Sequence, residues 1–206
     1  MAIYGVSSYG AGTGLSASEI KNLALFTLGF PDEIDFSDST DATVQKVNRI
    51  YATSLMFVLT NYPWRFVLKR VSITASQTDA GDSYKYKYNY VLPVQALAIR
   101  TLYTDVNYSC PIKEFESTPK SINTDASTVY VWYISQIDEE DFPQYFIDYF
   151  KYKLALDLCF NLTGDTDLIQ LLQAKETAQL ISSKNIDAKQ NKTRTIRSSP
   201  FTQIRG

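Results

Sequence analysis

The chain has 206 residues, of which 45% are hydrophobic and 20% are charged, and its formal net charge is −2. These values indicate one globular domain with a substantial core and exclude a mainly disordered chain. There is no histidine, which excludes a histidine general base and a histidine metal ligand. The two cysteines, Cys110 and Cys159, form no CxxC motif, which favours unpaired structural thiols.

The charge is distributed unevenly along the chain. Residues 184–206 contain six basic residues and one acid, a net charge of +5 that leaves −7 for the remainder. An acidic body with a basic end predicts that the end meets an anionic partner. No apolar run reaches the ~20 residues that span a bilayer, and no signal peptide is evident at the start. We therefore expect no membrane contact and folding inside a cell.

Two helices are predicted in the first third of the chain, after a glycine-rich segment. Residues 1–15 are rich in glycine, serine and tyrosine and are expected to form a flexible arm. A capping box of Ser16 and Glu19 predicts a helix over 16–29, and apolar residues spaced by three or four predict another over 41–62. The acidic loop between them lacks the glycine and glutamate of a calcium-binding EF-hand loop, so capping and a solvated loop are the favoured interpretation.

An aromatic segment, Tyr62-Pro63-Trp64-Arg65-Phe66, follows the second helix. The proline ends the helix. Trp64 and Phe66 could form a ligand site, but aromatic clusters mostly pack together. We interpret these two residues as a hinge between helices and sheet, or as part of a subunit interface.

Residues 66–136 are predicted to form a small antiparallel sheet, with a loop-rich stretch over 108–125 and a strong strand at 129–134. Four tyrosines fall on one face of an expected strand over 84–93: Tyr84, Tyr86, Tyr88 and Tyr90. Such a stripe could stack the bases of single-stranded nucleic acid, but Lys85 and Lys87 fall on the opposite face. A half-buried strand or a subunit interface is therefore favoured.

Two further helices are predicted, over 143–163 and 165–190. The first is apolar most of the way round, so we expect it to touch partners on several sides. The acidic run Asp138–Asp141 precedes it, where negative charge suits the helix dipole. The predicted fold class is thus α+β: a four-helix bundle with the sheet inserted between the second and third helices, a domain spanning 16–190, and an extended tail over 191–206.

This succession of helix, tryptophan motif, tyrosine-alternating strand ending in Leu92-Pro93, and two closing helices resembles the tail tubular protein A family of short-tailed bacteriophages. The resemblance covers roughly residues 16–190 and implies a non-enzymatic virion structural protein, made in the host cytoplasm, with no cofactor and no metal. It implies a ring, dodecameric in relatives, that connects the portal protein to the downstream tail nozzle protein. DNA would pass through the lumen without specific binding.

The resemblance further implies that the tail, residues 191–206, docks on the portal. The residues expected to make this contact combine basic and apolar side chains: Lys192, Arg194, Ile196, Arg197, Phe201, Ile204 and Arg205. A solvated tail without a partner is the alternative interpretation.

A nucleic-acid-binding module is the alternative function, in which Lys85, Lys87 and the basic tail grip DNA. It predicts an affinity that falls steeply with salt. An enzyme is disfavoured because the sequence has no histidine and no paired catalytic motif. The four adjacent acids Asp138–Asp141 also lack the difference in environment that general acid–base pairs need.

Overall fold

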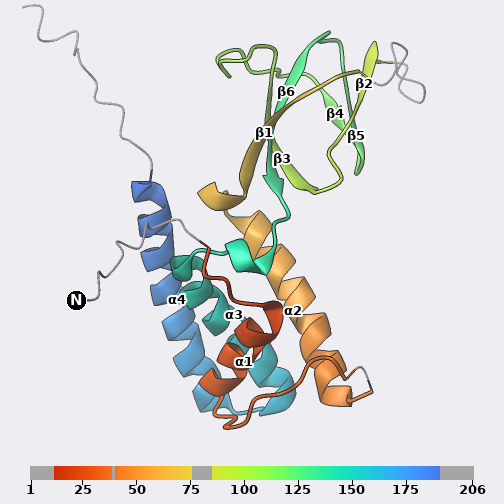
Figure 1. Ribbon diagram of the computed structural model, residues 1–206. Coiled ribbons are helices and arrows are strands. Elements are labelled where there is room, and N and C mark those ends of the chain that lie inside the picture. Colours follow the sequence, from red (N-terminus) through yellow and green to blue (C-terminus); the bar gives the residue numbers. More distant parts are fainter. Residues whose placement is uncertain (1–11, 39, 76–84, 191–206) are drawn as a thin grey trace, which may run out of the picture.

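The computed structural model describes residues 12–38, 40–75 and 85–190 (Figure 1). These residues form four α-helices, two short 3-10 helices and six strands. The helices are α1 (Ala17–Thr27), α2 (Ala42–Asn61), η1 (Arg65–Val67), η2 (Glu139–Asp141), α3 (Gln144–Leu162) and α4 (Thr166–Lys189). The strands are β1 (Leu68–Ile73), β2 (Tyr88–Val91), β3 (Ala96–Tyr103), β4 (Glu116–Ser117), β5 (Ser121–Thr124) and β6 (Val129–Ser135). The fold class is α+β, as predicted.

Side-chain caps explain where the helices begin. The predicted capping box is present at α1, where the Glu19 amide donates to Ser16 Oγ at 3.3 Å and the Ser16 amide donates to Glu19 Oε2 at 2.7 Å. Asp41 accepts from the first-turn amides of α2, and Asp165 does the same for α4. These contacts satisfy amide groups that the helix itself leaves without partners.

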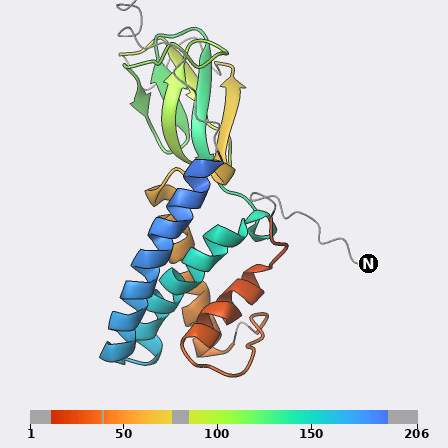
Figure 2. The same ribbon diagram turned by 90° about the vertical axis from the view of Figure 1, so that its left-hand side faces the viewer.

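Helix α3 lies at the centre of the helical part and contacts α1, α2 and α4. Its buried side chains include Phe146, Phe150, Leu154 and Leu158. The nearly continuous apolar surface predicted for this helix is therefore used largely within the chain, because three helices surround it. In Figures 1 and 2 the helices form one end of the molecule and the strands form the other.

The prediction of one small sheet is wrong, because the strands form two three-stranded antiparallel sheets of order β1-β6-β3 and β2-β5-β4. Strands β4 and β5 lie within the stretch predicted to be loop-rich. Strand β5 pairs with β2 on one side and with β4 on the other, and β2 joins neither β1 nor β3. The expected tyrosine strand is also shorter than predicted, since only Tyr88–Val91 pairs, with Ser121–Thr124.

The two sheets share a core to which both contribute. Tyr90 and Ile122 from one sheet pack with Leu102, Val131 and Tyr133 from the other. A second, larger core fills the helical part and extends to η1 and to Ile134 of β6. The outer residues of β1 and β6, among them Arg70 and Trp132, alternate with these buried positions.

Residues 12–14, the last described part of the predicted arm, run beside η2. The Thr13 amide donates to the Phe142 carbonyl at 3.0 Å, and the Gly14 amide donates to the Glu140 carbonyl at 2.9 Å. A Cβ on Gly12 would lie 2.3 Å from the Glu140 carbonyl oxygen. Only glycine therefore fits at this close approach. Residues 1–11 lie outside the described residues.

Candidate functional site

The helical part and the sheets meet around Trp64, which has no exposed surface. Its ring centroid lies 4.7 Å from that of Tyr62, 5.3 Å from Phe146 and 5.9 Å from Tyr149. Phe66 is half-buried, and its ring lies 6.1 Å from Phe142. The structure thus places both predicted hinge or interface residues at the boundary between helices and sheets, with Trp64 wholly inside the chain.

Asp187, near the end of α4, connects this helix to the junction between helices and sheets. Its buried carboxylate accepts the Arg65 amide at 3.0 Å and the Tyr145 hydroxyl at 2.8 Å. Burial raises the pKa of Asp187, and the Arg65 amide, the Tyr145 hydroxyl and the Arg65 charge oppose that rise. The carboxylate is therefore an internal acceptor that joins η1, α3 and α4.

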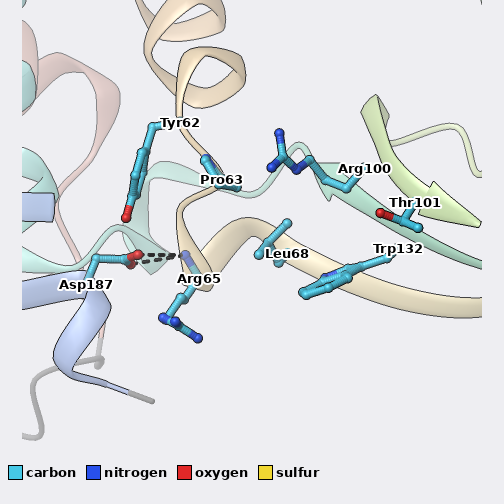
Figure 3. Close-up of a pocket in the computed structure, with 8 residues that line it drawn as sticks. All are labelled: Tyr62, Pro63, Arg65, Leu68, Arg100, Thr101, Trp132 and Asp187. Carbon is cyan, nitrogen blue, oxygen red and sulfur yellow. Dashed lines mark hydrogen bonds between the residues drawn. The ribbon is translucent and has the colours of Figure 1, made fainter. Parts of the chain in front are cut away.

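A pocket of about 230 Å³ opens beside this carboxylate (Figure 3). Its walls come from the end of α2, from η1, from strands β1, β3 and β6, and from α4. The residues that line it are Tyr62, Pro63, Arg65, Leu68, Arg100, Thr101, Trp132 and Asp187. Figure 3 shows the Arg65 backbone, and not its guanidinium, facing Asp187.

Trp132 links this pocket to a third arginine on the outer face of β1. The Arg70 guanidinium lies 4.6 Å from the Trp132 ring centroid and 4.8 Å from that of Tyr108. Tyr108 has a φ of 56°, an uncommon conformation outside glycine. We call Arg65, Arg70 and Arg100, together with Trp132, the arginine strip.

The arginine strip was not predicted from the sequence. Strand alternation in β1 placed Arg70 on one face, but its proximity to Arg100 depends on both strands pairing with β6. The register sets Arg70 and Thr101 opposite Trp132, and a bulge lies between Ile99 and Thr101. No local pattern carries that information.

The tyrosine stripe lies mainly inside the sheet part. Tyr86 and Tyr90 are buried, Tyr88 is half-buried, and Tyr84 lies outside the described residues. The Tyr90 hydroxyl donates to the Ala126 carbonyl at 2.6 Å. These contacts use most of the surface that the stripe would offer to a second chain.

The two neighbouring lysines lie over tyrosine rings. Lys85 Nζ is 5.0 Å from the Tyr86 ring centroid, and Lys87 Nζ is 5.2 Å from that of Tyr88. Sequence alternation predicted these lysines on the face opposite the tyrosines. Lys85–Lys87 precede the paired part of the strand, so strict alternation does not govern them.

A second hollow, of about 690 Å³, is an apolar groove between α2, α3 and the start of α4. Phe57 and Phe160 line it while remaining 52% and 76% exposed. At its floor the Ser54 hydroxyl donates to Asp157, which also pairs with Lys153. We call this feature the helical groove.

Among the described residues, no cluster of three or more Cys, Asp or Glu side chains is placed to hold a metal ion. No helix within the described ranges has the length and apolar character needed to cross a membrane. The predicted portal-contact residues, from Lys192 to Arg205, lie outside the part of the chain that the structure describes.

No protein-family model matches the sequence, and no curated protein matches it.

Proposed function

We propose that this protein is a virion structural protein that forms an oligomeric ring between the portal and the tail and extends the DNA channel. The proposal combines the family resemblance with a structure whose most prominent surface features favour association. The ring would be homo-oligomeric and dodecameric. Its further partners would be the portal protein and the tail nozzle protein.

The helical groove is the observation that carries the proposal. Two phenylalanines, Phe57 and Phe160, are more than half exposed beside the half-buried Ile50, Leu156 and Ile169. Contiguous apolar surface of this kind marks interaction sites in soluble proteins. A second copy of the chain is the occupant that we propose, since a closed ring must cover part of every subunit with its neighbour.

Charge supports the same proposal. Outside residues 184–206 the chain carries a net charge of −7. Phosphate binding is driven by lysine and arginine, so an acidic wall would let DNA slide through a lumen without adhering to it. The basic residues of the tail would face the portal.

The first experiment counts copies of the chain. Quantitative peptide mass spectrometry on purified virus particles from the source should find one ring's worth of this chain relative to the major capsid protein. Absence from the particle would overturn the proposal, whatever the isolated chain does in solution.

A matched pair of variants tests the helical groove. Phe57→Ser with Phe160→Ser should weaken self-association at least tenfold, because each buried phenylalanine contributes about 1.5–3 kcal/mol. Val94→Ser is the control, since Val94 is fully exposed outside the groove. Mass photometry over a concentration series measures both, and equal association constants would remove the groove from the interface.

A nucleic-acid-binding module is the second candidate function. The observation that favours it is the arginine strip, where Arg70 lies against two aromatic rings in a manner suited to phosphate and base contacts. It predicts binding to free DNA that weakens steeply as salt rises. The ring proposal predicts little affinity for free DNA.

A further inference from the structure

We infer that the arginine strip binds the acidic turn of a neighbouring copy, residues 138–141, and so forms one contact of the ring. The inference rests on the proposed function and deepens it by assigning the two surfaces that meet. It concerns residues at the junction of helices and sheets, separate from the helical groove.

Within the strip, Arg70 offers hydrogen-bond donors beside two aromatic rings. Arg70 lies against both Trp132 and Tyr108, at 4.6 and 4.8 Å from their ring centroids. Stacking of a guanidinium leaves its N–H edge free to bind a carboxylate or phosphate in a bidentate manner. Arg65 and Arg100 are exposed beside the pocket that Trp132 also lines.

None of these three arginines has an ion pair within the described part of the chain. The ion pairs there join Lys151 to Asp148 and Lys153 to Asp157, all on α3. Cations near this junction that have no anion within ion-pair distance in the described part of the chain attract an anionic partner.

The acidic turn has complementary properties. Asp138, Glu140 and Asp141 are exposed, whereas Glu139 accepts the Tyr51 hydroxyl at 3.2 Å. The turn is also held in place, because residues 13 and 14 donate backbone hydrogen bonds to the carbonyls of 142 and 140. An anionic surface already fixed in shape loses little conformational entropy when it binds.

Of the two acidic segments, the acidic turn matches the arginine strip better in its position along the molecule than the acidic loop before α2 does. The turn and η1 both lie between the helices and the sheets, and the Phe66 and Phe142 rings are 6.1 Å apart. Subunits standing side by side would bring such patches together at one level, as a heterologous ring contact requires. The acidic loop before α2 lies at the far end of the helices (Figure 1).

The test is a charge swap in the full-length chain. Arg70→Glu with Arg100→Glu should lower the association constant at least tenfold, and Glu140→Arg with Asp141→Arg should do the same. The four substitutions combined should restore association to within about threefold of the wild type, because opposite charges meet again. Circular dichroism confirms that each variant is folded.

The control variant reverses the charge of two exposed lysines in loops that connect the strands, Lys113→Glu with Lys120→Glu. It changes the net charge as much as the arginine variant does, and its association constant should stay that of the wild type. Mass photometry measures all variants, and affinity for a short DNA duplex is measured in parallel at two salt concentrations.

The outcomes separate the inference from the proposed function. Loss of association in both reversed variants and recovery in the combined one would support the contact. If the wild type forms rings and Arg70→Glu with Arg100→Glu leaves them intact, the contact is wrong and the ring proposal stands. If that variant instead loses only salt-dependent DNA binding, the strip binds phosphate and the inference is overturned. A wild-type protein that stays monomeric at every concentration overturns the contact. The ring proposal is then still tested by the copy number of the chain in virus particles.

Discussion

Removing the indole of Trp64 should show how strongly the helices and sheets are joined. The side chain is fully buried, and its Nε1–H donates to the Val58 carbonyl at 2.9 Å. That carbonyl belongs to the last turn of α2, which ends at Asn61, so the helix has no amide to offer it. Trp64 therefore fills the core and caps a helix at the same time.

Two substitutions separate the packing role of Trp64 from its capping role. Trp64→Ala should lower the free energy of unfolding by about 3–5 kcal/mol, the range for deleting a large buried aromatic side chain. Trp64→Phe keeps most of the ring but leaves the Val58 carbonyl unpaired, at a cost of about 1–3 kcal/mol. Because natural domains are stable by only about 5–15 kcal/mol, the alanine variant should be close to unfolding at room temperature.

Urea denaturation followed by far-ultraviolet circular dichroism measures both losses. Trp132→Phe is the control, since Trp132 is only half-buried and lies on the sheet surface, and its cost should be smaller than that of either Trp64 variant. A Trp64→Phe variant as stable as the wild type would refute the capping role. A Trp64→Ala variant that loses less than about 1 kcal/mol would refute the central place of this residue in the core.

Two further predictions concern the ends of the chain. Gly12→Ala should release residues 12–14 from η2, because its Cβ would collide with the Glu140 carbonyl. Hydrogen exchange of the Thr13 and Gly14 amides should then become faster. Thr13→Ala is the control, because it keeps the backbone contact. Deleting residues 191–206 should abolish docking to the portal in a pull-down assay while leaving the circular dichroism spectrum unchanged. A truncated chain that still docks normally would show that the tail is not the portal contact.

The helices could be predicted from the sequence because their signals are local. Ser16, Asp41 and Asp165 each cap a helix within three residues of themselves, and Gly29 and Gly164 adopt the positive φ that ends one. The expected spans differ from the observed helices by a single residue at most boundaries, which are their caps. The central position of α3 likewise followed from an apolar surface too wide for one contact.

The sheets and the arginine strip could not be predicted in the same way. Strand β5 is only four residues long, and its Asn123 and Thr124 are polar yet buried, so its tendency to form a strand comes from pairing with β2. The strip unites Arg70 and Arg100 through Trp132, which lies more than thirty residues from either in sequence. Strand order therefore had to be known before the strip could be recognised.

Asp187 should give stability an unusual dependence on pH. Burial raises the pKa of this carboxyl in the folded chain above its ordinary value of 3.8. The folded state then holds the proton more tightly than the unfolded state, so this group stabilises the fold as pH falls and destabilises it when ionised. Its contribution should therefore increase as pH is lowered from neutrality through the raised pKa and level off near 3.8. Most other carboxyls with shifted pKa values, such as Glu19 and Asp105, are lowered and act in the opposite sense.

Two substitutions isolate this contribution from the rest of the protein. Asp187→Asn keeps an acceptor for the Arg65 amide and cannot ionise. As pH falls, the unfolding free energy of the wild type should therefore rise relative to that of the variant. Asp187→Ala leaves the Arg65 amide and the Tyr145 hydroxyl unpaired and should cost about 2–5 kcal/mol in all. If the wild type instead loses stability relative to Asp187→Asn on acidification, the fold stabilises the ionised carboxylate. The conclusion that burial makes this charge costly would then be wrong.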